Sequence, residues 1–134
     1  MRVRLALLAD SANVSREGKL NILGVFDTIY ARQFPTVHPQ MQLVIRFEAS
    51  PEEAGSTHQI EVQLVTQDGR VAIRLPATMT VGRRELGEVI GIDHILALNN
   101  VTLEEPGRYT FRIAVDGTVA AAMSLRVEPL PVQH

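Results

Sequence analysis

Residues 108–127 read RYTFRIAVDGTVAAAMSLRV, and this stretch decides the fold class. Apolar and polar side chains alternate on both sides of Asp116-Gly117. The apolar positions are Tyr109, Phe111, Ile113 and Val115 before the turn, and Val119, Ala121, Met123, Leu125 and Val127 after it. Such alternation is typical of half-buried strands. Asp-Gly between two such runs predicts a β-hairpin with a type I′ turn, whose two central residues both need a positive φ.

The same pattern recurs upstream. Asp68-Gly69 separates a run with Ile60, Val62 and Leu64 from a run with Val71, Ile73 and Leu75, which predicts a second hairpin. Residues Gln42–Ala49 alternate as one further half-buried strand. The polar segment Ser50–Thr57, which holds Pro51 and Gly55, is expected to be a loop.

The amino-terminal part is predicted to hold two strands. The run Leu5–Ala9 reads as the first strand, and Ser11–Gly18 as the loop after it. Residues Leu20–Ala31 are apolar on both alternations, so we expect one long strand with a bulge or bend at Gly24. Lys19, the single lysine, is expected to lie in the turn that enters this strand.

The later part of the chain gives mixed signals. Arg83–Leu86 could form a helical turn, and Ile92–Leu98 is expected to be a strand. Residues 129–134 are expected to form an extended tail, since two prolines in three residues cannot donate to a sheet. Residues 1–128 are therefore predicted to form a single all-β domain, a two-layer antiparallel β-sandwich of about eight strands with an immunoglobulin-like Greek key.

Composition excludes several classes of function. The chain has 134 residues and no cysteine, which rules out disulfides, thiolate metal sites and cysteine nucleophiles. Its net charge is −2 and it has six aromatic residues, so a nucleic-acid partner is not expected. The apolar run after Arg4 stops at Asp10, too short for a signal peptide, and no stretch is long enough to span a membrane. A cytoplasmic location is expected.

Residues Asn99–Phe111 resemble the E–F corner of immunoglobulin-like domains, in which a leucine, an acidic turn, a glycine and a tyrosine precede strand F. The resemblance implies that the Tyr109 hydroxyl bonds back to the upstream backbone, and that Phe111 takes the place of the second cysteine of antibody domains. Both antibody cysteines and the strand C tryptophan are missing, so only the sandwich architecture is implied.

More of the chain resembles a family of small uncharacterised bacterial proteins. The residues that carry this resemblance are Gly18–Asp27, Phe34-Pro35, His38-Pro39 and the Pro-Gly-x-Tyr-x-Phe segment of Pro106–Phe111. The resemblance implies a β-sandwich and no particular function.

No metal site, cofactor or catalytic residue is predicted. The histidines are His38, His58, His94 and His134, and none is paired with another at the short spacings of metal sites. His38 is expected in a loop, and His58 is expected to be an exposed strand residue. The serines, at positions 11, 15, 50, 56 and 124, lack the Gly-x-Ser-x-Gly setting of a hydrolase nucleophile.

Acidic and glycine-rich segments also have ordinary interpretations. Asp10, Asp27 and Asp93 lie next to apolar runs, where a carboxylate could do acid–base work but more often ends a strand. The segments Gly82-Arg83-Arg84 and Gly87–Gly91 lack the spacing of a phosphate loop.

Three functions remain open. The leading hypothesis is a non-enzymatic protein-binding or assembly module that contacts another protein or a second copy of itself. The two apolar faces of Leu20–Ala31 support it, and so do Val44 and Val65, which are expected to point outward. The second is a ligand-binding protein or enzyme with a pocket formed by Asp10, Asp27 and His38. The third is a structural component of a larger bacterial assembly with head-to-tail contacts.

Overall fold

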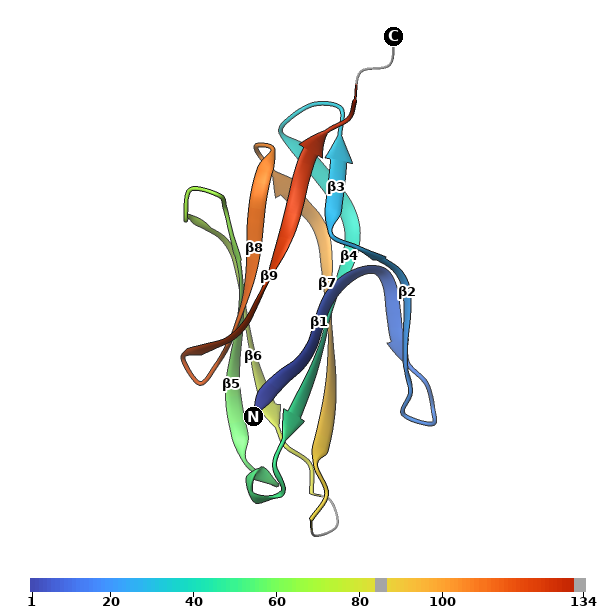
Figure 1. The fold of residues 1–134 in the computed structure, drawn as a ribbon, viewed down its shortest axis with the longest axis vertical. Coiled ribbons are helices and arrows are strands. Elements are labelled where there is room, and N and C mark those ends of the chain that lie inside the picture. Colours follow the sequence, from blue (N-terminus) through green and yellow to red (C-terminus); the bar gives the residue numbers. More distant parts are fainter. Residues whose placement is uncertain (84–86, 132–134) are drawn as a thin grey trace.

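The computed structural model describes residues 1–83 and 87–131, and it consists almost entirely of β-strands. The strands form two sheets that pack face to face as a sandwich (Figure 1). This confirms the predicted fold class, with nine strands where about eight were expected.

Four strands make the first sheet, in the order β2-β1-β4-β7. Their bounds are Arg2–Val14 for β1, Leu20–Phe26 for β2, Thr36–Ala49 for β4 and Ile90–Leu103 for β7. All neighbours in this sheet are antiparallel. Strands β4 and β7 are longer than the sequence predicted, because β4 begins before Gln42 and β7 extends past Leu98 to the start of the corner before Tyr109.

Five strands make the second sheet, in the order β3-β9-β8-β5-β6. Their bounds are Thr28–Ala31 for β3, Thr57–Val65 for β5, Val71–Thr80 for β6, Gly107–Val115 for β8 and Thr118–Pro129 for β9. A single 3-10 turn, η1 at Pro51–Glu53, lies in the polar loop between β4 and β5. Both predicted hairpins, β5–β6 and β8–β9, belong to this sheet.

The predicted strand Leu20–Ala31 is wrong as a single element. The chain passes from the first sheet to the second at Asp27, so Leu20–Phe26 pairs with β1 while Thr28–Ala31 pairs in parallel with β9. The backbone N–H of Arg126 donates to the Asp27 carbonyl across 2.8 Å and fixes this transfer. Both pieces therefore lie at sheet edges and not in the middle of the sandwich, and the sandwich is not wholly antiparallel.

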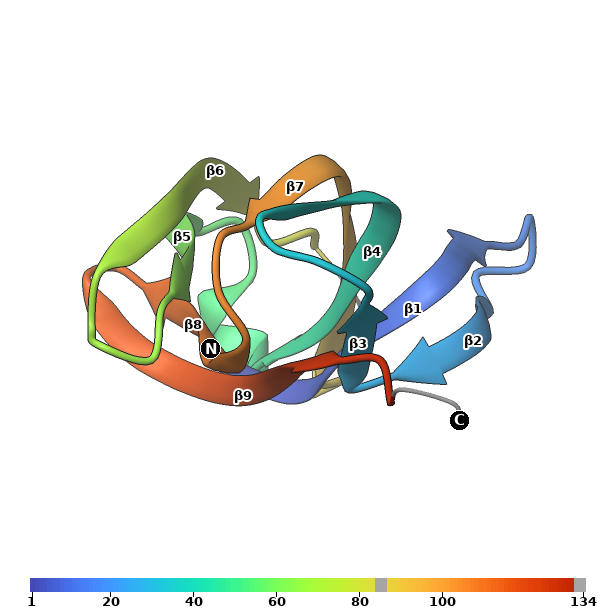
Figure 2. The same ribbon diagram turned by 90° about the horizontal axis from the view of Figure 1, so that it is seen from above.

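The predicted loop Ser11–Gly18 is also shorter than expected. Strand β1 continues to Val14 and pairs residue by residue with β2, and the Asn21 side-chain amide donates to Asn13 Oδ1 across 2.9 Å. Figure 2 shows that this β1–β2 hairpin projects beyond the packed sheets. Polar residues are compatible with a strand here because both faces of the projecting ribbon meet solvent. Lys19 lies in the turn before β2, as predicted, and its carbonyl accepts a hydrogen bond from the Ser15 N–H.

The two Asp-Gly sequences differ in turn geometry. Asp116 and Gly117 have φ values of 51° and 84°, which confirms the positive φ expected of both central residues. At the other turn only Gly69 has a positive φ, and Thr66 and Arg70 close a longer loop through the Thr66 N–H and the Arg70 carbonyl. The predicted hairpin is confirmed there, with a register shift between Leu64 and Val65.

The core lies between the inner faces of the two sheets. Its largest fully buried side chains come from both layers, and they include Leu8, Leu43, Ile45, Phe47, Ile60, Leu64, Phe111, Ile113 and Leu125. The alternation in β8 is confirmed by the burial of Tyr109, Phe111 and Ile113. Val119 differs from the prediction, since it is 56% exposed near the beginning of β9.

The remaining segments also differ in part from expectation. The start of the predicted tail is paired, because Pro129 ends β9 and the Leu130 N–H donates to the Ala31 carbonyl. Residues 132–134, which include His134, lie outside the described residues. The predicted helical turn over Arg83–Leu86 falls on residues 84–86, which the structure does not describe. No helix within the described ranges is long and apolar enough to cross a membrane.

Candidate functional site

The structure does not assemble the pocket proposed from Asp10, Asp27 and His38. The carboxylate of Asp10 lies against Gly24, Asp27 accepts a hydrogen bond from the Thr28 hydroxyl, and the His38 ring lies 6.0 Å from the Phe26 ring. Within the described part of the chain, no hydrogen bond joins any two of the three side chains. Cavities on the sandwich surface are lined by other residues, among them Thr66, Arg70 and Tyr109.

The third predicted acid, Asp93, is in a cross-strand ion pair. Asp93 lies within β7, and its two carboxylate oxygens accept hydrogen bonds from Arg46 on β4 at 2.7 and 3.1 Å. This cross-strand pair raises the pKa of Arg46 and satisfies the carboxylate. Of the three acids interpreted as strand ends, only Asp27 lies between strands, because Asp10 and Asp93 are inside β1 and β7.

Nothing in residues 1–83 and 87–131 groups three or more histidine or carboxylate side chains as a metal site would need. His38 was expected in a loop, but it lies in β4. His94 lies in β7. The Nε2 atoms of both histidines are buried without a hydrogen-bond partner. Burial lowers the pKa of His94 below its usual value, so this ring favours its neutral form.

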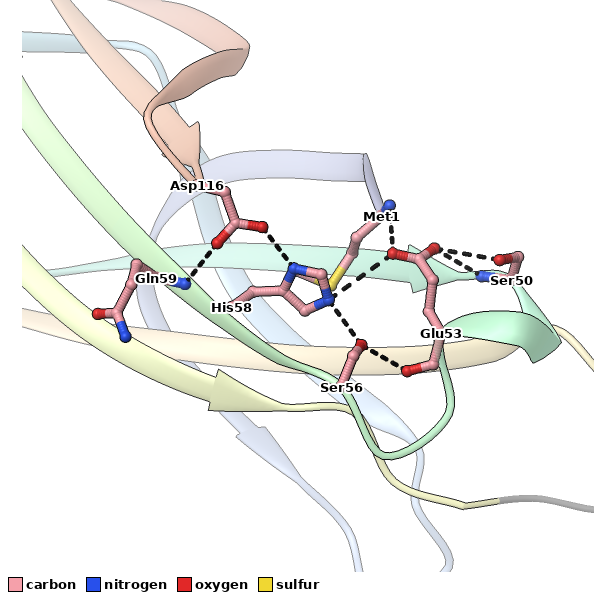
Figure 3. Close-up of polar contacts among 7 residues, drawn as sticks. All are labelled: Met1, Ser50, Glu53, Ser56, His58, Gln59 and Asp116. Carbon is pink, nitrogen blue, oxygen red and sulfur yellow. Dashed lines mark hydrogen bonds and ion pairs between the residues drawn. The ribbon is translucent and has the colours of Figure 1, made fainter.

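The structure does bring together a polar cluster that sequence reasoning missed. Figure 3 shows the His58 ring between Asp116 and Ser56, with Glu53 beside it. His58 Nδ1 lies 2.7 Å from Asp116 Oδ2, and His58 Nε2 lies 2.8 Å from Ser56 Oγ and 3.7 Å from Glu53 Oε2. His58 lies in strand β5, as predicted, but the prediction that it is exposed is wrong, because its side chain is only 13% exposed.

Local turns position each member of this cluster. Asp116 is the first residue of the tight β8–β9 turn, and its Oδ1 also accepts the Gln59 N–H across 2.9 Å. Glu53 ends η1, and its Oε1 accepts hydrogen bonds from the N–H and hydroxyl of Ser50 in a capping box. Its Oε2 accepts the amino group of Met1 across 2.8 Å. The His58 hydrogen bond lowers the pKa of Asp116, and the Met1 amino group lowers the pKa of Glu53.

The order serine, Nε2, Nδ1, aspartate is the order found in serine hydrolases, so its chemistry needs examination. A hydrolase also needs N–H donors directed at the oxyanion that forms next to the serine. Here the N–H groups of Gly55 and Ser56 donate to the carbonyls of Val81 and Glu53, at 2.8 and 2.9 Å. The Ser56 hydroxyl is itself bonded to the Glu53 carbonyl. The geometry suits a clamp that ties η1 and β5 to the β8–β9 turn.

In the described parts of the glycine- and arginine-containing segments, Gly82–Arg83 and Gly87–Gly91, the geometry is that of ordinary turns and strands. Arg83 lies with its guanidinium against Gly55, and Arg84 is outside the described residues. Gly87 has a φ of 92°, and the segment after it enters β7 with no helix following. Gly87 thus lies before the strand, as expected of a loop glycine, whereas Ile90 and Gly91 already belong to β7.

Comparison with known families identifies the group to which the chain belongs. The profile of a family of unknown function, DUF6941, matches residues 4–128 and therefore spans nearly all of both sheets. The chain belongs to DUF6941. A comparison with curated proteins finds no match. The expectation of a family without an assigned function is confirmed.

This DUF6941 chain presents a second feature on the first sheet, at strand β2 and the adjoining outer face. Leu23 and Val25 of β2 are 72% and 60% exposed, and Val14 across the hairpin is 46% exposed. The register places Val25 opposite Ala9, Leu7 opposite Val44, and Val44 opposite Ile95. An apolar stripe thus crosses all four strands of the first sheet on the face turned away from the core.

The members of this stripe are separate from the core. Ala9 and Val44 are fully buried but belong to neither cluster of buried core residues, and Leu7 and Ile95 are not packed against those clusters. Val44 and Val65 had been expected to expose apolar surface, but they are 0% and 3% exposed. The accessible part of the stripe is therefore its β2 end, at Leu23 and Val25.

Proposed function

We propose that this DUF6941 chain is a non-enzymatic protein-binding or assembly module that contacts another protein chain through β2 and the apolar stripe beside it. The observation that carries the proposal is the edge strand β2, whose seven residues LNILGVF include no charged residue and no proline. Unpaired backbone groups on an uncharged edge strand are a template for pairing with another chain.

The other edges differ from β2 in ways that discourage such pairing. Strand β6 carries Arg74 and Pro76, and β3 is only four residues long. Strand β7 carries Asp93. Charges, prolines and short length are usual protections of an edge, so the lack of charge and proline on β2 supports a binding role for it.

The chemistry of the His58 cluster supports the non-enzymatic part of the proposal. The Ser56 hydroxyl and the N–H groups of Gly55 and Ser56 are already engaged with carbonyl groups of the chain. The proposal places the protein in the bacterial cytoplasm, with an immunoglobulin-like arrangement, and without a nucleic-acid or membrane partner. The net charge of −2 supports the absence of a nucleic-acid partner. The hydrogen bond from the Tyr109 hydroxyl to the Glu105 carbonyl supports the immunoglobulin-like arrangement.

Site-specific photo-crosslinking tests this proposal. A photoreactive phenylalanine analogue replaces Leu23 in cells that produce the protein, and a matched variant carries it at Arg112, an exposed position of β8 in the second sheet. We expect an adduct of defined mass at position 23 and none at position 112. Equal labelling at both positions, or no adduct at position 23, would overturn the proposal.

A second candidate, a hydrolase with Ser56 as nucleophile, is favoured by the placement of Ser56 and Asp116 on the two nitrogens of His58. Hydrolysis of p-nitrophenyl acetate by the purified protein tests it, with Ser124→Ala on β9 as the control. A rate abolished by Ser56→Ala and kept by Ser124→Ala would establish the hydrolase. We expect the same background rate from all three proteins.

A further inference from the structure

The ends of β2 carry opposite charges at equal distances from its centre. Lys19 precedes the strand and Asp27 follows it, and Leu23 lies midway between them. Both charged side chains are exposed, and neither forms an ion pair within the described ranges of the chain. The edge is therefore basic at one end, acidic at the other and uncharged between.

We infer that the partner of β2 is a second copy of this chain, bound by antiparallel pairing of the two β2 strands about a two-fold axis at Leu23. The inference rests on the proposed function and names the partner. In this register Leu23 meets Leu23 of the second copy, and the two four-stranded sheets become one continuous sheet of twice the width. A two-fold axis closes the assembly at two copies.

Charge complementarity selects this register. Antiparallel pairing about Leu23 places Lys19 opposite Asp27 of the second copy, and Asp27 opposite Lys19 of the second copy. A parallel pairing in register would instead put Lys19 against Lys19 and Asp27 against Asp27, and like charges directly opposite one another are destabilising. Antiparallel registers displaced from Leu23 lose both charge pairs, because the two pairs are related by the same axis.

The apolar surface agrees with the same arrangement. Leu23 and Val25 lie on the outer face, at the end of the stripe that runs through Ala9, Leu7 and Val44. Pairing of the two edges joins the stripes of the two copies at their exposed ends. Leu23 and Val25, the most exposed apolar residues of the first sheet, then contact each other across the axis and lose contact with water.

The glycine in β2 is compatible with this pairing. Gly24 has a φ of 73° and lies opposite Asp10 of β1, whose carboxylate occupies the space where a side chain would be. In the proposed register Gly24 meets Ile22 of the second copy. Because Gly24 has no side chain, the group next to Ile22 of the second copy at this point is the Asp10 carboxylate of β1.

Reciprocal charge variants test the inference by sedimentation velocity over a concentration series. Lys19→Asp turns both charge pairs into acidic repulsions, and Asp27→Lys turns both into basic repulsions. We expect each variant to raise the dimer dissociation constant at least about tenfold, because two attractive contacts become repulsive together. Far-UV circular dichroism and thermal unfolding identify any variant that fails to fold.

Mixing the two variants gives the decisive observation. A Lys19→Asp chain and an Asp27→Lys chain are complementary at both charge pairs, so the mixture is expected to regain the dimer that each variant has lost. The double variant, which exchanges both charges within one chain, is expected to dimerise alone. A wild-type dimer whose dissociation constant is unchanged in both single variants would overturn the inference, as would variants whose mixture stays monomeric.

The remaining outcomes separate this inference from the proposed function. A wild-type monomer with a position 23 adduct to a different protein overturns the second copy as partner and leaves the binding function standing. A monomer without any adduct at position 23 overturns both. Species that grow beyond the dimer with concentration indicate head-to-tail assembly, and they too overturn pairing about a two-fold axis.

Discussion

His58 and Asp116 are 58 residues apart in the sequence, yet His58 Nδ1 lies 2.7 Å from Asp116 Oδ2. The contact fastens the start of β5 to the β8–β9 turn, and Ser56 and Glu53 extend it to η1. The start of β5 and the β8–β9 turn, which have no strand pairing with η1, are thereby held to it. The cluster stabilises the end of the sandwich at which the chain passes from β4 to β5.

The stability of the protein in acid is expected to depend on Asp116. The His58 hydrogen bond lowers the pKa of Asp116 in the folded state, so the folded state binds this proton less readily than the unfolded state. The stabilisation is complete above the ordinary aspartate pKa of about 3.9, and it is lost as the pH falls through and below that value. We expect Asp116→Asn, which keeps a residue tolerant of positive φ, to unfold less steeply with falling pH than the wild type.

Thermal unfolding midpoints measured from pH 6 to pH 2 check this expectation. Glu17→Gln, at an exposed position in the β1–β2 turn, is the matched control and should follow the wild type. Identical pH profiles for Asp116→Asn and the wild type would show that the His58 contact contributes nothing to acid stability.

His94 is expected to make the folding stability depend on pH in a second range, closer to neutrality. Burial lowers the pKa of His94 in the folded state, so protonation favours the unfolded chain. The contribution of neutral His94 is complete above the ordinary histidine pKa of about 6.5, and it falls as the pH drops below that value. We expect urea unfolding of His94→Leu to change less between pH 7 and pH 5 than that of the wild type. Parallel losses of stability in the two proteins would contradict this assignment.

The Tyr109 hydroxyl is expected to stabilise the corner between β7 and β8. It donates a hydrogen bond to the Glu105 carbonyl across 2.7 Å, and the ring is buried. Tyr109→Phe removes the donor and should lower the free energy of unfolding by about 1 kcal/mol. Tyr30→Phe is the control, because Tyr30 is 54% exposed. Urea titration measures the free energy of unfolding of both variants. An equal loss in the two variants would show that the corner hydrogen bond does not stabilise the protein.

Gly24 should not tolerate even a methyl group. An alanine Cβ at this position would overlap the carboxylate of Asp10, and the φ of 73° is unfavourable for any residue with a side chain. We expect Gly24→Ala to destabilise the protein by about 1–2 kcal/mol through the backbone alone. The second change Asp10→Ala should relieve the overlap and recover part of the loss. Gly91→Ala, where a Cβ meets open space, should be neutral in the same denaturation experiment.

The sandwich could be predicted from the sequence wherever a strand buries one face. In β8 and β4, inward residues such as Phe111 and Phe47 alternate with polar ones, so period-two alternation identifies both the strand and its buried face. The transfer at Asp27 could not be predicted in this way. It depends on β9, a partner distant in the chain, and no local pattern distinguishes one strand with two apolar faces from two strands in different sheets.

The polar cluster was missed for a related reason. Asp116 both forms the β8–β9 turn and bonds to His58. Its place before Gly117 identifies only the turn role from the sequence. Only the pairing of β5 with β8 brings His58 next to that turn, and the spacing of 58 residues leaves no local signal. The opposite charges of Lys19 and Asp27 were visible in the sequence, but their meaning depends on β2 being an edge.

The parallel pairing of β3 with β9 has a consequence for biosynthesis. Thr28–Ala31 acquires its partner only when Arg126–Pro129 is available, so most of the described chain must be made before the two can meet. In a chain still on the ribosome, β2 can pair with β1 before β9 is made, whereas β3 then lacks the strand to which it pairs. The final closure of the sandwich thus belongs to the period after β9 leaves the ribosome, and long-range closure of this kind slows folding.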